Sequence, residues 1–241
     1  MKLLLSACAI FFYFSAFCQN SVIDSIARLQ AKNAVEVYDQ YNKDDEPVYN
    51  GDEYLYYTFR MDGDPFFLSP FFDYGWVSYN GRKYDSIKMI YDVVRNQLVA
   101  LSPDKLNRIV MHNEFIDSFF LRGHTFNKLQ EDHKQNLYNS GFFDILYNGE
   151  NIQFLELRSK VRNPRIIGNV LITSFIGKNR FYIHKNGLYY LVSGKKDVFR
   201  VFSDKVHDLK KRMRQNHVKL KRKNFEFAAP KVAAIYDQLT H

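Results

Sequence analysis

Cysteine is almost absent from this 241-residue sequence, which contains only Cys8 and Cys18. If the chain is cleaved after Cys18, the 223 residues that remain contain no thiol. Such a chain cannot use a thiolate nucleophile, form a disulfide or build a sulfur-rich metal site. Its stability then has to come from a hydrophobic core, and a chain of this length is long enough to bury one.

Glycine and proline are also scarce, with 11 and 6 residues, which excludes a low-complexity or linker protein. The sequence has no Gly-x-Ser-x-Gly, His-Glu-x-x-His or Cys-x-x-Cys motif. The histidines at 112, 124 and 133 lie near carboxylates, but their spacing fits no zinc pattern, and structural roles are the better interpretation. We therefore predict no catalytic residue, no metal site and no cofactor.

The N-terminus has the pattern of a signal peptide. A basic start at Lys2 is followed by an apolar run over residues 3–17, which is too short to span a bilayer. Ala16 favours cleavage after Cys18, so residues 1–18 are predicted to be removed on export to the periplasm, outer-membrane surface or medium. In the alternative, Cys18 becomes a lipid-modified N-terminus, although Phe17 is larger than the residue that this reaction prefers.

Residues 19–192 are predicted to form an N-terminal helix followed by an antiparallel β domain. Val22, Ile26 and Leu29 have helical spacing, which predicts a helix at about 21–40. The aromatic content of 17% and four Asn-Gly pairs, at 50–51, 80–81, 148–149 and 186–187, predict strands joined by hairpin turns. Strands are expected at 54–59, 85–91, 98–101, 108–112, 115–121, 142–147, 152–157, 170–176, 181–184 and 188–192. The predicted fold is mainly β with flanking helices (α+β), an antiparallel meander forming a curved sheet or open barrel.

Residues 193–241 are predicted to be helices packed on the same domain, and they hold the positive charge. Residues 195–223 contain twelve basic and three acidic residues, while the whole chain has a net charge of +8. Four cations of one predicted helix are candidate binding residues: Lys210, Lys211, Arg212 and Arg214. The candidate partners are an acidic glycan or another anionic envelope component, including peripheral contact with a membrane; export argues against nucleic acid. The alternative is a solvated helix face.

An aromatic segment at residues 66–79, expected to be a loop, is the second candidate site. It contains Tyr74 and Trp76, the only tryptophan. Exposed rings would form a platform that stacks on sugar rings or a hydrophobic site for a partner, whereas buried rings would plug the open end of the sheet.

Several short motifs are found along the chain, most of them containing tyrosine or glycine. They include Tyr49-Asn50-Gly51-x-x-Tyr54, Tyr79-Asn80-Gly81-x-x-Tyr84, Gly123-His124-x-Phe126, Tyr147-Asn148-Gly149 and Val218-Lys219-Leu220-Lys221. In these the chain resembles a group of secreted proteins of Bacteroidetes-type bacteria to which no activity is assigned. The resemblance implies a secreted, sheet-rich protein and transfers no chemistry.

These observations favour an exported, non-catalytic binding or structural module of the cell envelope. The alternative is an envelope hydrolase or carbohydrate-processing enzyme whose acid and base are two carboxylates that the fold brings together.

Overall fold

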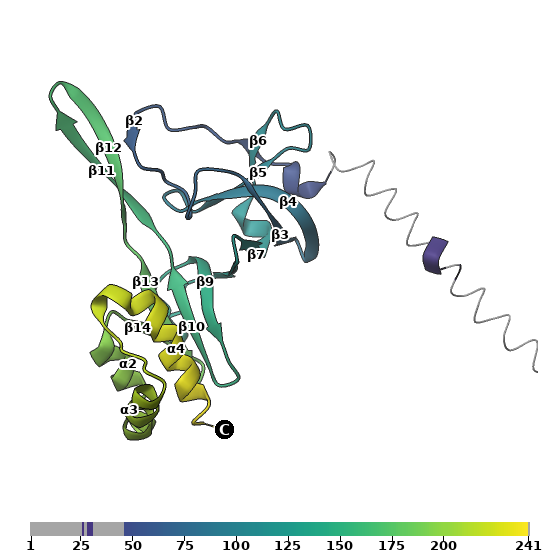
Figure 1. Cartoon of the computed structure of the whole chain (residues 1–241). Coiled ribbons are helices and arrows are strands. Elements are labelled where there is room, and N and C mark those ends of the chain that lie inside the picture. The colour runs from purple at the N-terminus through teal and green to yellow at the C-terminus, as the bar shows by residue number, and fades with distance from the viewer. Residues whose placement is uncertain (1–25, 27, 31–45, 241) are drawn as a thin grey trace, which may run out of the picture. The chain divides into compact units, whose positions relative to one another are not determined.

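The structure is a computed structural model that describes residues 26, 28–30 and 46–240 (Figure 1). The predicted signal peptide lies outside the described residues. Of the helix expected at 21–40, only residues 26 and 28–30 are described, and these are helical. Among the described helices, none combines the length and the apolar composition needed to cross a membrane.

The main element is an antiparallel sheet of 11 strands, in the order β1-β6-β5-β4-β3-β7-β8-β9-β10-β13-β14. Its end strands do not pair, so the sheet is not closed into a barrel. The strands are β1 (Asp52–Glu53), β3 (Asp73–Tyr79), β4 (Arg82–Asp92), β5 (Gln97–Leu101), β6 (Arg108–Val110), β7 (Ile116–Leu121), β8 (His124–Leu129), β9 (Gly141–Asn148), β10 (Ile152–Leu157), β13 (Arg180–Lys185) and β14 (Leu188–Val192). The predicted mainly β fold with an antiparallel meander is confirmed.

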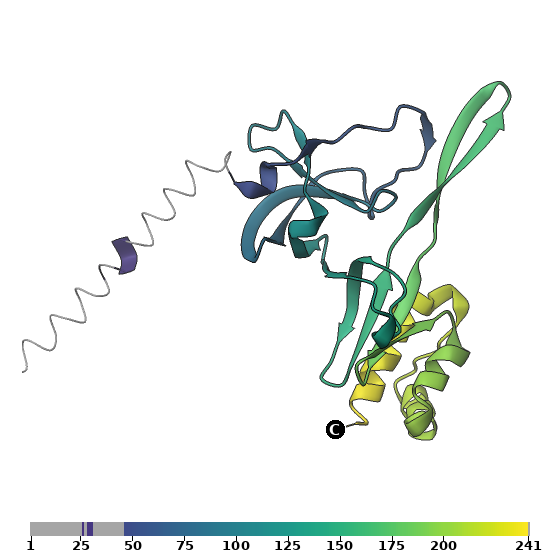
Figure 2. The same ribbon diagram turned by 180° about the vertical axis from the view of Figure 1, so that it is seen from behind.

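A smaller sheet of three strands is built around a hairpin that lies between β10 and β13 in the sequence. It consists of β11 (Lys160–Ile167) and β12 (Val170–Gly177), which form a hairpin, and of β2 (Arg60–Asp62), which pairs in parallel with β12. Figures 1 and 2 both show this hairpin extending away from the large sheet.

Helices gather at the C-terminus. They are α2 (Lys195–Val201), α3 (Val206–Gln215) and α4 (Phe225–Asp237), together with the 3-10 turns η5 (Ser203–Lys205) and η6 (Arg222–Asn224). Three further 3-10 turns lie before or between the strands: η2 (Pro47–Tyr49), η3 (Asn113–Phe115) and η4 (His133–Gln135). Helix α4 packs on β9 and β10, α2 packs on β14, and α3 packs on α4 (Figure 2). The helices therefore cover the end of the sheet formed by its last strands.

Two large clusters of buried side chains make up most of the core. In the first, Phe119 and Phe126 of β7 and β8 stack with ring centroids 4.6 Å apart. In the second, the helices cover β10, β13 and β14, and Phe202 stacks on Tyr236 at 4.0 Å. Buried aromatic pairs of this kind add to the free energy gained from burial itself.

Two of the four Asn-Gly predictions are confirmed as two-residue hairpin turns. Asn80-Gly81 joins β3 to β4 and Asn186-Gly187 joins β13 to β14, with positive φ at all four residues. Asn148-Gly149 begins the longer connection between β9 and β10. The prediction for residues 50–51 is wrong: Gly51 precedes β1 and lies against the backbone of Val110, where a Cβ would come within 2.1 Å of the carbonyl oxygen.

Some strand predictions are also wrong. Residues 54–59, predicted as a strand, form none; the hydroxyls of Tyr54 and Tyr57 both donate to the buried carboxylate of Asp92 (2.8 and 2.9 Å). The expected aromatic loop contains strand β3, in which Val77 and Tyr79 face the core. Strands β1, β2, β8 and β11 were not predicted.

Candidate functional site

The clearest candidate site is a groove in the C-terminal helical region, with a volume of about 440 Å³. Helix α2 supplies one wall, since Lys195 and Phe199 are four residues apart and lie on one face. Helix α3 supplies the facing wall, and the extended connector after it closes one side. The lining residues are Lys195, Phe199, Lys210, Met213, Arg214, Val218, Lys219, Leu220 and Lys221. We call this the cationic groove.

The connector contributes because its side chains alternate. Val218 and Leu220 turn towards the protein, and Leu220 is only 6% exposed, whereas Lys219 and Lys221 are exposed. Such alternation is the pattern of an extended chain with one face on the core. Residues 218–221 therefore contribute two apolar and two cationic side chains to the lining of the groove.

The cationic groove has five cations and no carboxylate in its lining. In the part of the chain that the structure describes, none of the five makes an ion pair. Lys195 and Lys210 stand over the Phe199 ring, with their Nζ atoms 5.5 and 5.3 Å from its centroid. The floor is apolar, with Met213 buried beneath the cations. The arrangement suits an anion attached to an apolar group.

The helix separates the four basic residues predicted together on α3. Lys210 and Arg214, four residues apart, line the cationic groove. Lys211 and Arg212 lie on another side, in a hollow of about 410 Å³ that also contains the carboxylate of Asp208. Four further groove residues were not singled out from the sequence as site residues, although they belong to the same basic segment: Lys195, Phe199, Lys219 and Lys221. For Lys219 and Lys221, the sequence signal that could have identified them is the alternation of apolar and basic residues at positions 218–221.

Tyr74 and Trp76 lie on one face of β3, opposite the core. Trp76 stacks on Phe120 of β7 with a centroid distance of 6.3 Å and an interplanar angle of 9°, and Lys83 Nζ lies 5.1 Å from its ring. The Trp76 ring is therefore already used within the protein. Tyr74 is 62% exposed, with Lys88 Nζ 5.8 Å from its ring centroid.

The rest of the aromatic segment divides between core and surface. Phe66 and Phe67 are buried, while Phe71 is exposed. The structure thus brings no continuous row of exposed rings together over residues 66–79, and the paired phenylalanines serve packing.

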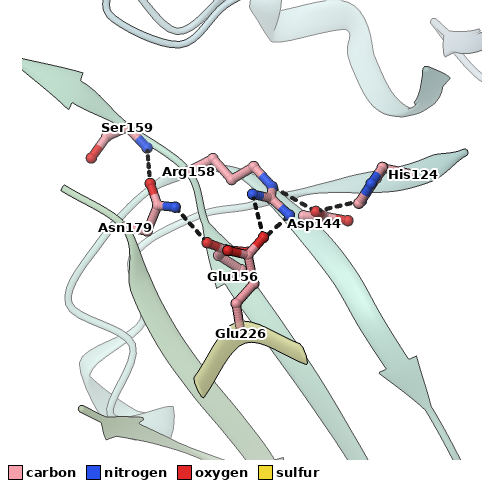
Figure 3. Close-up of polar contacts among 7 residues, drawn as sticks. All are labelled: His124, Asp144, Glu156, Arg158, Ser159, Asn179 and Glu226. Carbon is pink, nitrogen blue, oxygen red and sulfur yellow. Dashed lines mark hydrogen bonds and ion pairs between the residues drawn. The ribbon is translucent and has the colours of Figure 1, made fainter. Parts of the chain in front are cut away.

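A second polar site is buried between β9 and β10 (Figure 3). Asp144 and Glu156 face each other across the two strands, and both are fully buried. Arg158 joins them: its Nε donates to Asp144 (2.7 Å), its Nη2 lies 2.9 Å from Glu156, and its Nη1 donates to Glu226 of α4 (3.0 Å). His124 Nδ1 lies 2.8 Å from Asp144. We call this group the buried ionic network.

The network contains more carboxyl groups than cations. Desolvation raises the pKa of Glu156 to about 8, and the nearby carboxylates add to this effect against the opposing influence of Arg158. Asn179 donates to Glu156 Oε1, whereas Oε2 lies within ion-pair distance of Arg158 but accepts no hydrogen bond. Burial therefore favours the protonated form of Glu156 to higher pH than for an exposed glutamate.

A protonated carboxyl beside a second carboxylate is chemically able to act as an acid. In this structure, however, Asp144 and Glu156 have no exposed surface, and the more accessible side chains at the edge of the network are His124 and Glu226. A substrate cannot contact either buried carboxylate. The network links β8, β9, β10 and α4 and stabilises their packing.

Elsewhere, His133 contacts Glu131 and His112 lies 4.0 Å from Glu114, as isolated pairs. Over residues 46–240, no group of three or more potential His, Cys, Asp or Glu ligands is positioned to hold a metal ion.

Comparison with protein-family models, with curated proteins and with solved structures finds no match to this chain. The functional argument therefore depends on the geometry of the cationic groove and on the sequence.

Proposed function

We propose that this protein is an exported, non-catalytic binding module of the cell envelope, and that the cationic groove binds an anionic envelope component with an apolar part. The observation that carries the proposal is the lining, which has no carboxylate and places over an apolar floor five cations that form no ion pair with any residue that the structure describes. A lipid phosphate or an acidic glycolipid has this chemistry, since its charge and its apolar group are adjacent. The apolar run at residues 3–17 supports export.

The alternative of a hydrolase using paired carboxylates is not the function that we propose. The pair that best fits it, Asp144 and Glu156, is fully buried. The exposed cationic groove, in contrast, is open to a ligand.

The proposal predicts a difference between two charge-matched variants of helix α3. K210E/R214E changes two cations of the cationic groove, and K211E/R212E makes the same charge change outside it. The probe is dihexanoyl phosphatidylglycerol, a short-chain anionic phospholipid kept monomeric in solution, and affinity is measured by isothermal titration calorimetry. We expect K210E/R214E to weaken binding by about tenfold or more, because each cation near an anionic lipid contributes on the order of 1 kcal/mol.

K211E/R212E should bind nearly as the unchanged protein does, and binding by both should weaken with added salt. Equal losses in the two variants would mean that net charge and not the groove attracts the probe. Binding that does not depend on salt would also contradict the proposal.

A further inference from the structure

The β11–β12 hairpin carries a surface that the proposed function does not use. Apart from residues 172–174 of β12, which pair with β2, the hairpin has no partner strand in the described part of the chain. Every residue from 164 to 171 is exposed. Figures 1 and 2 show this end of the hairpin pointing away from the large sheet.

The exposed end is apolar on both of its faces. Ile167 pairs with Val170, and Ile166 pairs with Leu171, so that one aliphatic pair lies on each face. These four side chains are 62%, 41%, 76% and 53% exposed, in that order. They surround the turn at Gly168-Asn169, where polar side chains are the usual choice. Four clustered aliphatic side chains at the end of a projection indicate contact with an apolar environment.

Cations lie directly below the apolar end. Arg162 and Arg165 are exposed and, being three residues apart on a strand, lie on opposite faces. No Asp or Glu occurs between residues 157 and 185. Two carboxylates lie further down the hairpin: Asp62 of β2 pairs with Ser174 at its middle, and Asp64 contacts Lys160 at its base, at 3.4 Å.

The hairpin is unsuited to edge pairing with another chain. Along one edge, Pro164 of β11 has no N–H to donate to a neighbouring strand, and along the other edge β2 already pairs with residues 172–174 of β12. A protein partner would also need a cavity that encloses two apolar faces at once. A bilayer requires no such shape, and its anionic headgroups complement Arg162 and Arg165.

We infer that the end of the β11–β12 hairpin inserts into the surface of a bilayer containing anionic lipids. Ile166, Ile167, Val170 and Leu171 enter the boundary of the acyl chains, and Arg162 and Arg165 bind headgroup phosphates. From Arg165 to the turn the strand advances roughly 10 Å, which matches the depth to which interfacial segments are buried. This inference is independent of the cationic groove, which lies on the C-terminal helices.

A tryptophan placed at the end of the hairpin tests the inference in the full chain. The probe is the variant I167W/W76F, in which the only tryptophan is at position 167. It is mixed with vesicles of phosphatidylglycerol and phosphatidylcholine whose acyl chains carry bromine. We expect a blue shift of the tryptophan emission and quenching by the brominated chains, both absent with pure phosphatidylcholine. This local signal does not depend on whether residues 3–17 also bind the vesicle.

Two further variants make the result specific. In L191W/W76F the tryptophan replaces another exposed aliphatic residue, on β14, and its emission should not change. Adding R162Q/R165Q to I167W/W76F should weaken vesicle binding about thirtyfold, from the loss of two headgroup contacts. The inference is overturned if position 167 gives no shift, if position 191 responds equally, or if the arginine variant binds unchanged.

Discussion

At the residue scale, Glu156 shows how burial alters a single carboxyl group. It is fully buried opposite Asp144, and its pKa is raised to about 8 mainly by desolvation. The unfolded chain releases this proton near pH 4.5, the ordinary value for glutamate. Between these two pH values the folded state holds a proton that the unfolded state does not.

The consequence is that Glu156 makes the protein less stable as pH rises. Its contribution to the free energy of unfolding is fully retained below about pH 4.5 and is lost progressively towards pH 8. In E156Q the side chain is always neutral, so this loss does not occur. We expect the stability of E156Q relative to the unchanged protein to increase by on the order of 4 kcal/mol from pH 4.5 to pH 9.

Urea unfolding of both proteins across this pH range measures the difference directly. Taking the difference cancels the titration of the other groups, which both proteins share. A difference that stays constant with pH would show that Glu156 ionises alike in the folded and unfolded states.

At the scale of elements, the same dipeptide serves two different purposes. Asn80-Gly81 forms a turn, in which Gly81 has a φ of 74° and a Cβ there would meet no atom within 4 Å. Gly51 forms no turn and is needed because β6 passes too close for any side chain. One glycine therefore supplies conformational freedom and the other supplies space.

Alanine substitutions distinguish these roles. G81A should cost about 1 kcal/mol, the price of placing a Cβ on a left-handed backbone. G51A should cost more, about 2 kcal/mol or above, because the Val110 carbonyl must move and the pairing of β1 with β6 is disturbed. Thermal unfolding of the two variants gives the comparison, and an equal or smaller loss in G51A would contradict the close approach.

At the scale of the whole molecule, one continuous sheet joins two core clusters. The first cluster contains side chains of β3 to β9, and the second lies between β10, β13, β14 and the helices. Strands β9 and β10 pair along most of their length, and the buried ionic network spans them. The two clusters should therefore unfold together.

One variant in each cluster tests this cooperativity. F119A removes a ring stacked on Phe126 in the first cluster, and F202A removes one stacked on Tyr236 in the second. Each should lower stability by roughly 3–5 kcal/mol while a single unfolding transition is retained. Circular dichroism reports the helices and tyrosine fluorescence reports mainly the sheet. If F202A melts the helices in a separate, earlier transition, the clusters are independent.

The sequence by itself determined the mainly β architecture, the C-terminal helices and two tight hairpin turns, because these depend on residues close together in the chain. It located the basic segment. It did not show that Lys210 and Arg214 line the cationic groove while Lys211 and Arg212 lie outside it, because that depends on how α3 faces α2 and the connector. It also missed β3, since exposed rings on one face of that strand masked the alternation of Val77 and Tyr79 on the other. Only the tertiary structure decided that Asp144, Glu156, Arg158 and Glu226 meet: strand pairing and helix docking bring together side chains up to 82 positions apart, and burial then changes their chemistry.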